Sequence, residues 1–260
     1  MVQKNSPMIE KLRRDELVVS AKLNITHPFV AEIAAYAGFD AIWVDMEHVP
    51  SDYNEVMHAF YAAKARGAET IVRTTRGAYS NLTRPLEMDA AAIMVPHVMG
   101  VEDAKQVAYY TKFAPIGRRP IDGGNGDGMY CMMGVEDYIK YSNEQKLTII
   151  QIEDIEAYEQ IEEIAQVPGI DMLFFGPADF SHSIGLVTDM GNPKIMEAKR
   201  RVAEIARKHG KLAGTVGGTG NMRDLYDMGY RLINLTADVV AIGNGFRDVM
   251  KEVESFRNSL

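Results

Sequence analysis

The chain has 260 residues, of which 47% are hydrophobic and 25% charged, the make-up of an ordinary globular protein with an ample core. Its formal net charge of −8 argues against a nucleic-acid partner, because phosphates call for a basic surface. No apolar run approaches the roughly 18–20 residues that span a bilayer, and the first residues lack the apolar stretch of a secretory signal. The single cysteine, Cys131, excludes an intrachain disulfide and a cysteine-rich metal site. We therefore expect a cytoplasmic protein that does not contact a membrane.

Short apolar segments that favour β-structure recur along the chain at regular intervals. Their nearly continuous hydrophobicity, as in AIWVDM and TIIQIE, is typical of parallel strands that are buried on both faces. The predicted strands are Leu17–Leu23, Ala41–Met46, Thr70–Thr74, Ala92–His97, Leu147–Glu153, Asp171–Pro177, Lys211–Val216 and Arg231–Thr236.

Amphipathic segments lie between these strands and are predicted to be helices. They are Phe29–Tyr36, Asp52–Arg66, Val101–Lys112, Asp154–Gln166, Lys194–His209, Gly220–Met228 and Asp238–Phe256. This alternation predicts an α/β protein with a closed (β/α)8 barrel, also called a TIM barrel, and a doubly wound open sheet is the alternative. No linker divides the chain, so we expect residues 1–260 to form a single domain.

One connection, Phe113–Met133, departs from the regular alternation. It is rich in glycine and long for a loop in a compact domain, and such loops are usually functional or mobile. It could form a wall or lid over an active site, or it could be a surface excursion without a role.

Polar residues gather where the predicted strands end, which is where the active site of a (β/α)8 barrel lies. These residues are Asp45, Glu47, His48, Arg73, His97, Gln151, Glu153 and Asp179. Glu153 and Asp179 follow neighbouring strands and could hold an octahedral divalent cation together with waters and substrate oxygens. The alternative is a pair of solvated loop carboxylates.

Three further residues suit acid–base and anion chemistry. His48 could act as a general base oriented by Asp45, or it could be a structural histidine. Arg73 could bind carboxylate or enolate oxygens, or it could form a partly buried salt bridge. No lysine lies at a convincing strand end, with Lys22 the nearest case, which favours a metal over an imine as the electron sink.

Several motifs in order resemble the HpcH/HpaI family of class II pyruvate aldolases. They are AGFDAIWVDMEHVPSDY at Ala37–Tyr53, IVRTT at Ile71–Thr75, MVPHV at Met94–Val98, IIQIED at Ile149–Asp154, FGPADFS at Phe175–Ser181 and MGYRLINLTADVVAI at Met228–Ile242. The resemblance covers nearly the whole chain, and the ordered D-x-E-H, Q-I-E and G-P-A-D elements are fairly specific. It implies a barrel of the phosphoenolpyruvate/pyruvate type.

The resemblance also implies a role for each matching residue. Glu153 and Asp179 would hold Mg²⁺, Mn²⁺ or Co²⁺, and His48, paired with Asp45, would handle a proton through a metal-bound water. Arg73 would contact the 2-oxo oxygen, and Gln151 would support the metal waters or the pyruvyl group. Two backbone N–H groups, those of Ala178 and Asp179, would hold the substrate carboxylate.

The implied reaction cleaves a 4-hydroxy-2-oxo acid into pyruvate and an aldehyde, or joins the two. The chain departs from the family's usual pattern in GRRPIDGGNGDGMYCMM and in TVGGTGN, which flank the expected position of the second substrate. The identity of the aldehyde therefore stays open. Two alternatives also stay open: citrate-synthase-like or citrate-lyase-like chemistry on the same barrel, and a barrel that binds a metabolite without catalysis.

The last segment, residues 238–260, is long and amphipathic. It could cover the last strand of its own barrel. The resembling family instead exchanges this helix between subunits and assembles as hexamers, which are trimers of dimers. The resemblance therefore implies a homo-oligomer, in which Asp89 and the glycine-rich loop could reach a neighbour's site.

Overall fold

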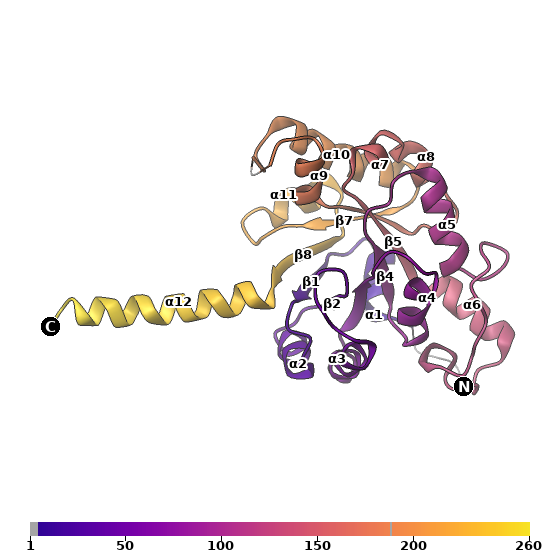
Figure 1. Cartoon of the computed structure of the whole chain (residues 1–260), viewed down its shortest axis with the longest axis horizontal. Coiled ribbons are helices and arrows are strands. Elements are labelled where there is room, and N and C mark those ends of the chain that lie inside the picture. Colours follow the sequence, from indigo (N-terminus) through magenta and orange to yellow (C-terminus); the bar gives the residue numbers. More distant parts are fainter. Residues whose placement is uncertain (1–4, 188) are drawn as a thin grey trace.

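Eight parallel strands close into one barrel in chain order, and β1 pairs with β8 to complete it (Figure 1). The computed structural model describes residues 5–187 and 189–260. The strands are β1 (Val18–Leu23), β2 (Ala41–Asp45), β3 (Glu69–Arg73), β4 (Ala92–Val95), β5 (Leu147–Ile152), β6 (Met172–Phe175), β7 (Leu212–Val216) and β8 (Leu232–Ala237). The predicted (β/α)8 barrel is thus confirmed, and the open-sheet alternative is excluded because each of the eight described strands pairs with a neighbour on both sides.

Helices surround the barrel, and every predicted helix is present. They are α1 (Pro7–Arg13), α2 (Pro28–Tyr36), α3 (Tyr53–Ala65), α4 (Ser80–Glu87), α5 (Val101–Thr111), η1 (Gly126–Gly128), α6 (Val135–Gln145), α7 (Ile155–Glu159), α8 (Ile161–Ala165), α9 (Pro177–Ser183), α10 (Pro193–Lys208), α11 (Met222–Met228) and α12 (Asp238–Arg257). The segment expected as one helix over residues 154–166 is divided into α7 and α8 at Gln160. The sequence prediction missed α1, α4, α6 and α9.

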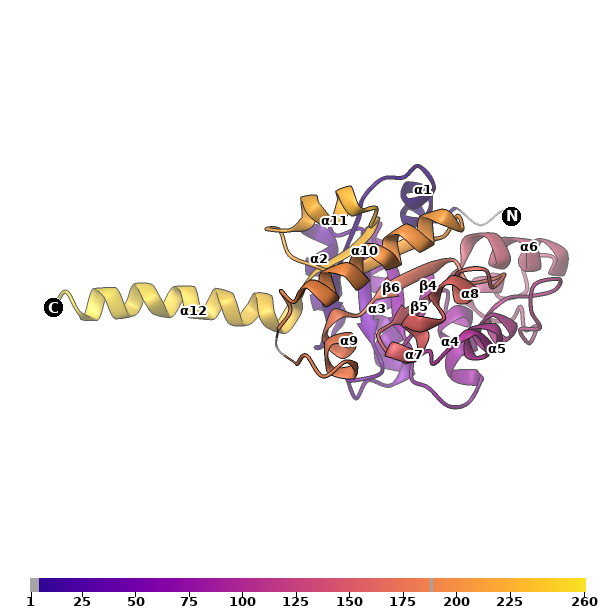
Figure 2. The same ribbon diagram turned by 90° about the horizontal axis from the view of Figure 1, so that it is seen from above.

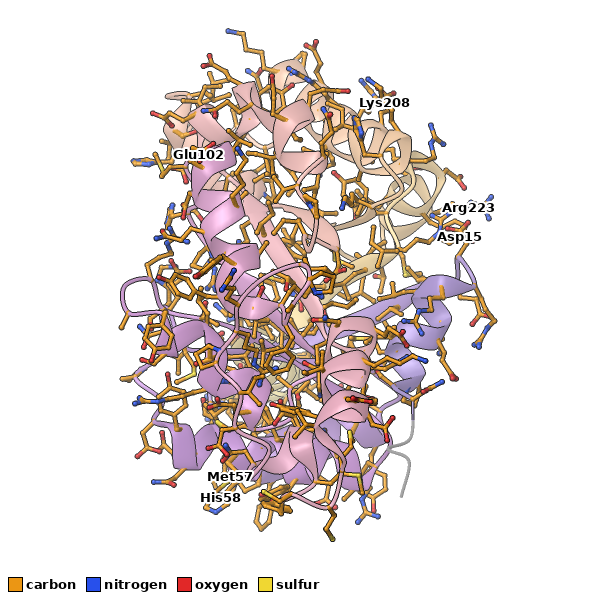
Figure 3. All side chains as sticks on the ribbon, turned by 90° about the vertical axis from the view of Figure 1, so that its right-hand side faces the viewer. Asp15, Met57, His58, Glu102, Lys208 and Arg223 are labelled. Atoms are coloured by element: carbon orange, nitrogen blue, oxygen red, sulfur yellow. The ribbon has the colours of Figure 1, made fainter. Side chains whose placement is uncertain are left out.

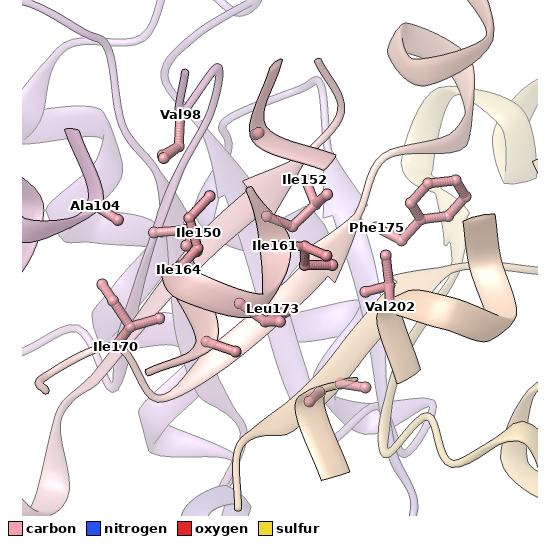
Figure 4. Close-up of a cluster of buried hydrophobic side chains, with 14 of the residues drawn as sticks. Val98, Ala104, Ile150, Ile152, Ile161, Ile164, Ile170, Leu173, Phe175 and Val202 are labelled. Carbon is pink, nitrogen blue, oxygen red and sulfur yellow. The ribbon is translucent and has the colours of Figure 1, made fainter. Parts of the chain in front are cut away.

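The apolar core has two layers, one inside the barrel and one between the strands and the outer helices. Trp43, Ile71 and Phe174 belong to the inner layer. In the outer layer, Ile150 on β5 and Leu173 on β6 face α8 and α10 (Figure 4). Charged side chains such as Glu102, Lys208 and Arg223 project from the outer surface of the helices (Figure 3).

The inward-facing positions become polar at the carboxyl ends of the strands. Side chains alternate between the two faces of a strand, so a residue two positions after an inward apolar residue also points inward. Asp45 follows Trp43 in this way, and Arg73 follows Ile71. Lys22 on β1 lies in the same ring of positions, because it follows Ser20, whose hydroxyl meets β8 inside the barrel. The barrel therefore places a ring of polar side chains at one end.

Helix α12 projects away from the barrel and has few contacts with it (Figures 1 and 2). Its apolar side chains are exposed: Val239, Val240, Ile242, Phe246, Val249, Met250 and Phe256. The outer face of α2 is also apolar and exposed, with Phe29, Ile33 and Tyr36. In the described part of the chain, neither α12 nor any other helix has the length and apolarity needed to cross a membrane.

The glycine-rich connection contains a buried ion pair that is hydrogen-bonded to α6. Arg119 Nη2 donates to Asp127 Oδ2 over 2.6 Å, and both side chains are completely buried. The Tyr138 hydroxyl donates to the same carboxylate oxygen at 2.9 Å, and Arg119 Nη1 donates to Ser142 Oγ at 2.9 Å. Beyond this anchor, Met129 and its two successors have positive φ values. These buried contacts therefore hold the loop in a defined conformation against α6.

We predict that Asp127→Ala destabilises the protein by about 3–5 kcal/mol, because the substitution leaves the Arg119 charge buried without its partner. Urea unfolding measures the change in the free energy of unfolding. Asp224→Ala, at an exposed position on α11, is the matched control and should stay within about 1 kcal/mol of the wild type. Equal stability of the two variants would show that the pair does not hold the loop.

Candidate active site

Asp45 is the last residue of β2, and its carboxylate is completely buried. Its Oδ1 accepts hydrogen bonds from Arg73 Nε at 2.9 Å and from the backbone N–H of Glu47 at 3.0 Å. Its Oδ2 accepts one from Arg73 Nη2 at 2.6 Å and lies 2.8 Å from Lys22 Nζ. Burial acts to raise the pKa of Asp45, but the hydrogen bonds and charges of Arg73 and Lys22 outweigh it and lower the pKa to about 2. Asp45 is thus a fixed anion.

The Arg73 guanidinium is held by three groups at the mouth of the barrel. Besides the two bonds to Asp45, its Nη1 lies 3.1 Å from Glu47 Oε2. Its Cζ lies 5.2 Å from the centroid of the Trp43 ring, which supports it from inside the barrel. The salt bridge considered as the alternative for Arg73 is therefore present, and it orients the guanidinium at the end of β3 where substrate would bind.

Lys22 belongs to the same cluster, although the motifs in the sequence predicted no role for it. It is the penultimate residue of β1. Its side chain is 19% exposed, whereas that of Asp45 is fully buried. The signal in the sequence was its position two residues after Ser20, because residues two apart on a strand point to the same face. What the sequence could not show was that Asp45, on the neighbouring strand, would accept its ammonium group.

His48 lies at the rim of the site, with its side chain 58% exposed. The structure differs from the expected pairing of Asp45 with the imidazole. Asp45 contacts only the backbone N–H of His48, at 3.5 Å, because Arg73 and Lys22 occupy its carboxylate. The carboxylate beside the ring is that of Glu47, whose Oε2 lies 3.5 Å from His48 Nε2.

His97, which follows β4, is a second imidazole in the site. Its φ of 47° is unusual for a non-glycine residue, and its backbone N–H donates to Glu153 Oε1 at 2.9 Å. Its Nδ1 lies 2.9 Å from Asp154 Oδ2, and its Nε2 lies 3.7 Å from Glu47 Oε1. Burial acts to lower its pKa, but the neighbouring carboxylates, Asp154 first, raise the pKa overall. The sequence marked this residue only as a strand-end histidine.

Glu153 follows β5 and is buried. Its Oε2 accepts a hydrogen bond from Gln151 Nε2 at 2.6 Å, and a side chain at Gly176 would collide with the same oxygen. Burial raises its pKa to about 7, and the negative charges of Asp179 and Glu47 add to the rise, against an opposing effect of the His97 backbone N–H. This carboxylate is therefore in surroundings that disfavour its charged form.

Asp179 lies in the first turn of α9, which follows β6, and its side chain is exposed. Ala178 precedes it in the same turn, where backbone N–H groups have no partner within the helix. The structure thus brings the predicted donors of Ala178 and Asp179 to the same end of the barrel as Arg73 and Glu153.

The residues around Glu153 fit a divalent cation. A cation bound there would offset the crowded negative charge that raises the pKa of Glu153. Among the described residues, Gln151 Oε1 is buried without a hydrogen-bond partner, so it could accept from a metal-bound water. The described chain has no cluster of three or more histidine, cysteine or carboxylate ligands. Two carboxylates with waters and substrate oxygens suit Mg²⁺ rather than a closed zinc site.

Asp89 lies at the opposite end of the barrel from this site. It precedes β4, and its carboxylate forms ion pairs with Lys64 and with the buried Lys146. Burial acts to raise the pKa of Asp89, but these two lysines lower the pKa overall. Its carboxylate is therefore engaged within its own chain.

The site and fold are those of a family of carbon–carbon lyases. A model of the HpcH/HpaI aldolase/citrate lyase family matches residues 23–244, and the chain belongs to this family. A 2-keto-3-deoxy-L-rhamnonate aldolase from Klebsiella pneumoniae is 32% identical over 211 residues, which are 81% of this chain and 78% of the relative. The chain is accordingly a carbon–carbon lyase of the aldolase type.

Solved structures support the family and the fold. An HpcH/HpaI aldolase/citrate lyase family protein from Burkholderia cenocepacia superposes with a TM-score of 0.88 at 31% identity, covering 96% of this chain and all of that one. The citrate synthase SbnG superposes with a TM-score of 0.88 at 25% identity, covering 97% of this chain and 99% of that one. The barrel is therefore shared by enzymes with different carbon–carbon chemistry.

The raised pKa of Glu153 predicts how the stability of the metal-free protein depends on pH. The folded-state pKa of about 7 exceeds the ordinary value of 4.5, so this group's contribution is fully present below about pH 4.5 and is lost as the pH rises through about 7. Glu153→Gln mimics the protonated form. In chelator, it should raise the midpoint of thermal unfolding more at about pH 8 than at about pH 5.

Glu136→Gln, at an exposed position on α6, is the control and should give the same small change at both pH values. If Glu153→Gln instead changed the unfolding midpoint equally at both pH values, the pKa of Glu153 would not be raised in the folded protein.

Proposed function

We propose that this protein is a divalent-metal-dependent aldolase that cleaves a 4-hydroxy-2-oxo acid into pyruvate and an aldehyde, or joins them. The observation that best supports the proposal is the placement of a buried guanidinium, that of Arg73, and the carboxylates of Glu153 and Asp179 at one end of the barrel. The relatives named as 2-keto-3-deoxy-L-rhamnonate aldolases support the same reaction class.

The side chains of the site suit each requirement of this reaction. Arg73 would donate to the 2-oxo oxygen, and the N–H groups of Ala178 and Asp179 would bind the substrate carboxylate. His48 would remove the proton of the 4-hydroxyl group as the C3–C4 bond breaks, and the bonding electron pair would pass to the pyruvyl fragment. Mg²⁺, Mn²⁺ or Co²⁺, held by Glu153 and Asp179, would supply positive charge that stabilises this electron pair.

We predict that chelator abolishes aldol turnover and that added Mg²⁺, Mn²⁺ or Co²⁺ restores it. Glu153→Ala and Asp179→Ala should lose activity while the barrel stays folded, because the carboxylates then no longer hold the cation. The assay is pyruvate formation from condensation products of pyruvate with a panel of aldehydes. Asp224→Ala is the control. Full turnover in chelator, or a borohydride-trapped adduct on a lysine, would contradict metal dependence.

A second candidate function is carbon–carbon bond formation on a larger acid, as in a citrate synthase. The likeness to SbnG supports it, because the barrel matches along nearly its whole length. The reactants separate the two candidates: an aldolase turns over pyruvate and a simple aldehyde without a thioester. The complete Asp45, Arg73, Glu153 and Asp179 set supports catalysis over mere metabolite binding.

We also propose that the protein is a homo-oligomer, a hexamer built as a trimer of dimers, in which α12 packs on a second copy. Its apolar stripe includes Phe246, which is 70% exposed, and Val249, and such a stripe costs free energy in water. The exposed apolar face of α2, with Phe29 and Ile33, offers a surface of matching character. Exchange of a terminal helix between identical chains would bury both faces.

Light scattering coupled to size exclusion should therefore give a mass of about six times the chain mass of 28.9 kDa. Phe246→Asp combined with Val249→Asp should lower the mass, because charge in the interface opposes burial. Lys251→Glu, on the polar side of α12, should leave the mass unchanged. A wild-type mass near 28.9 kDa would overturn the proposal.

A further inference from the structure

Lys22 is a charged residue of the site to which the proposed reaction gives no role. Its Nζ lies 2.8 Å from Asp45 Oδ2, and its register partner on β2 is Trp43. An ammonium group has three N–H donors, and Asp45 is the partner that the structure shows for this one. The side chain is partly exposed, and Lys22 lies at the same end of the barrel as Arg73.

Arg73 alone would be a weak cation for an anionic substrate. Its guanidinium is buried and contacts two carboxylates, those of Asp45 and Glu47. These three groups carry a net charge of minus one, which opposes the approach of a 2-oxo acid anion. Charges in a buried site are only weakly screened by salt, so solvent would not remove this opposition. The ammonium group of Lys22 brings the cluster to neutrality.

We propose that Lys22 is a positioning residue that offsets the charge of Asp45 and so leaves Arg73 effective as the cation that binds the 2-oxo acid. The proposal rests on the proposed function in one respect, namely that the ligand is a 2-oxo acid. Lys22 acts here through Asp45 and Arg73, and it does not form an imine with substrate.

The chain contains a natural reporter for this cluster. Trp43 is the only tryptophan in the sequence, and the Arg73 guanidinium lies over its buried ring. A ligand that contacts Arg73 therefore changes the surroundings of the single indole. Oxalate is a suitable probe because its adjacent oxygens resemble those of a 2-oxo acid enolate, yet it cannot undergo an aldol reaction. Trp43 fluorescence then measures binding without catalysis.

The experiment titrates oxalate into the full-length protein in excess Mg²⁺ and follows Trp43 emission. Lys22→Met should raise the dissociation constant by about tenfold or more, because one nearby positive charge is lost. Lys22→Arg should stay within about threefold of the wild type, because the charge is kept. Lys105→Met, which removes an exposed lysine on α5, is the matched control and should bind like the wild type. Circular dichroism checks that each variant is folded.

Three results would overturn the proposal. One is oxalate binding by folded Lys22→Met within twofold of the wild type, and another is a loss in Lys22→Arg equal to that in Lys22→Met. The third is the absence of oxalate binding by the wild type. If Lys22→Met is unfolded, Lys22→Gln takes its place with the same expected loss.

The proposed function can fail separately. If the wild type binds oxalate with the Lys22 dependence described but forms no aldol product with any aldehyde, the inference about Lys22 stands and the aldolase proposal does not. If aldol product forms while Lys22→Met binds oxalate normally, the aldolase proposal stands and the inference about Lys22 does not.

Discussion

The candidate site depends on one buried negative charge, that of Asp45. An isolated carboxylate in the interior of a barrel would be costly, so its oxygens must be satisfied. Arg73 and Lys22 supply the compensating charges, and the backbone N–H of Glu47 supplies a further hydrogen bond. Through these contacts one side chain fixes the ends of β1, β2 and β3 relative to each other. The orientation of Arg73 is a consequence of this requirement.

The closed barrel divides the charges of the site between two sectors. The cations lie on β1 and β3, on either side of Asp45, whereas Glu153 and Asp179 follow β5 and β6. An anionic 2-oxo acid between these sectors would face Arg73 and Lys22 on one side. On the other side it would meet carboxylates whose mutual repulsion a divalent cation relieves. This arrangement supports the proposed pyruvate chemistry.

Much of the fold could be predicted from the sequence because buried parallel strands have a strong local signal. The segment AIWVDM, for example, is apolar at every position but one, and all the predicted strands are present with shifts of one or two residues. Helices with weak local signals were missed. In α4, Pro85 interrupts the helical pattern, and in α9 the motif GPAD was interpreted as part of a site. The division of α7 from α8 at Gln160 had no evident signal.

The partners of the site residues were harder to predict, because they depend on contacts between strands. The motif D-x-E-H suggested a pair between Asp45 and His48, yet β3 and β1 bring stronger cations to Asp45, and Glu47 takes the place beside the imidazole. Lys22 and His97 have roles in the structure that their local sequence does not indicate. The motifs predicted which residues belong to the site, whereas their pairing depends on contacts between the strands of the barrel.

The central claim is that these residues form a site that stabilises negative charge on pyruvate. The most direct test is exchange of the pyruvate methyl protons in deuterium oxide with Mg²⁺, Mn²⁺ or Co²⁺ and no aldehyde, followed by proton NMR. The account predicts exchange by the wild type well above the enzyme-free rate, and its loss in chelator, because the cation would stabilise the negative charge that forms on pyruvate. Exchange by the wild type no faster than in enzyme-free solution, with every metal, would contradict it.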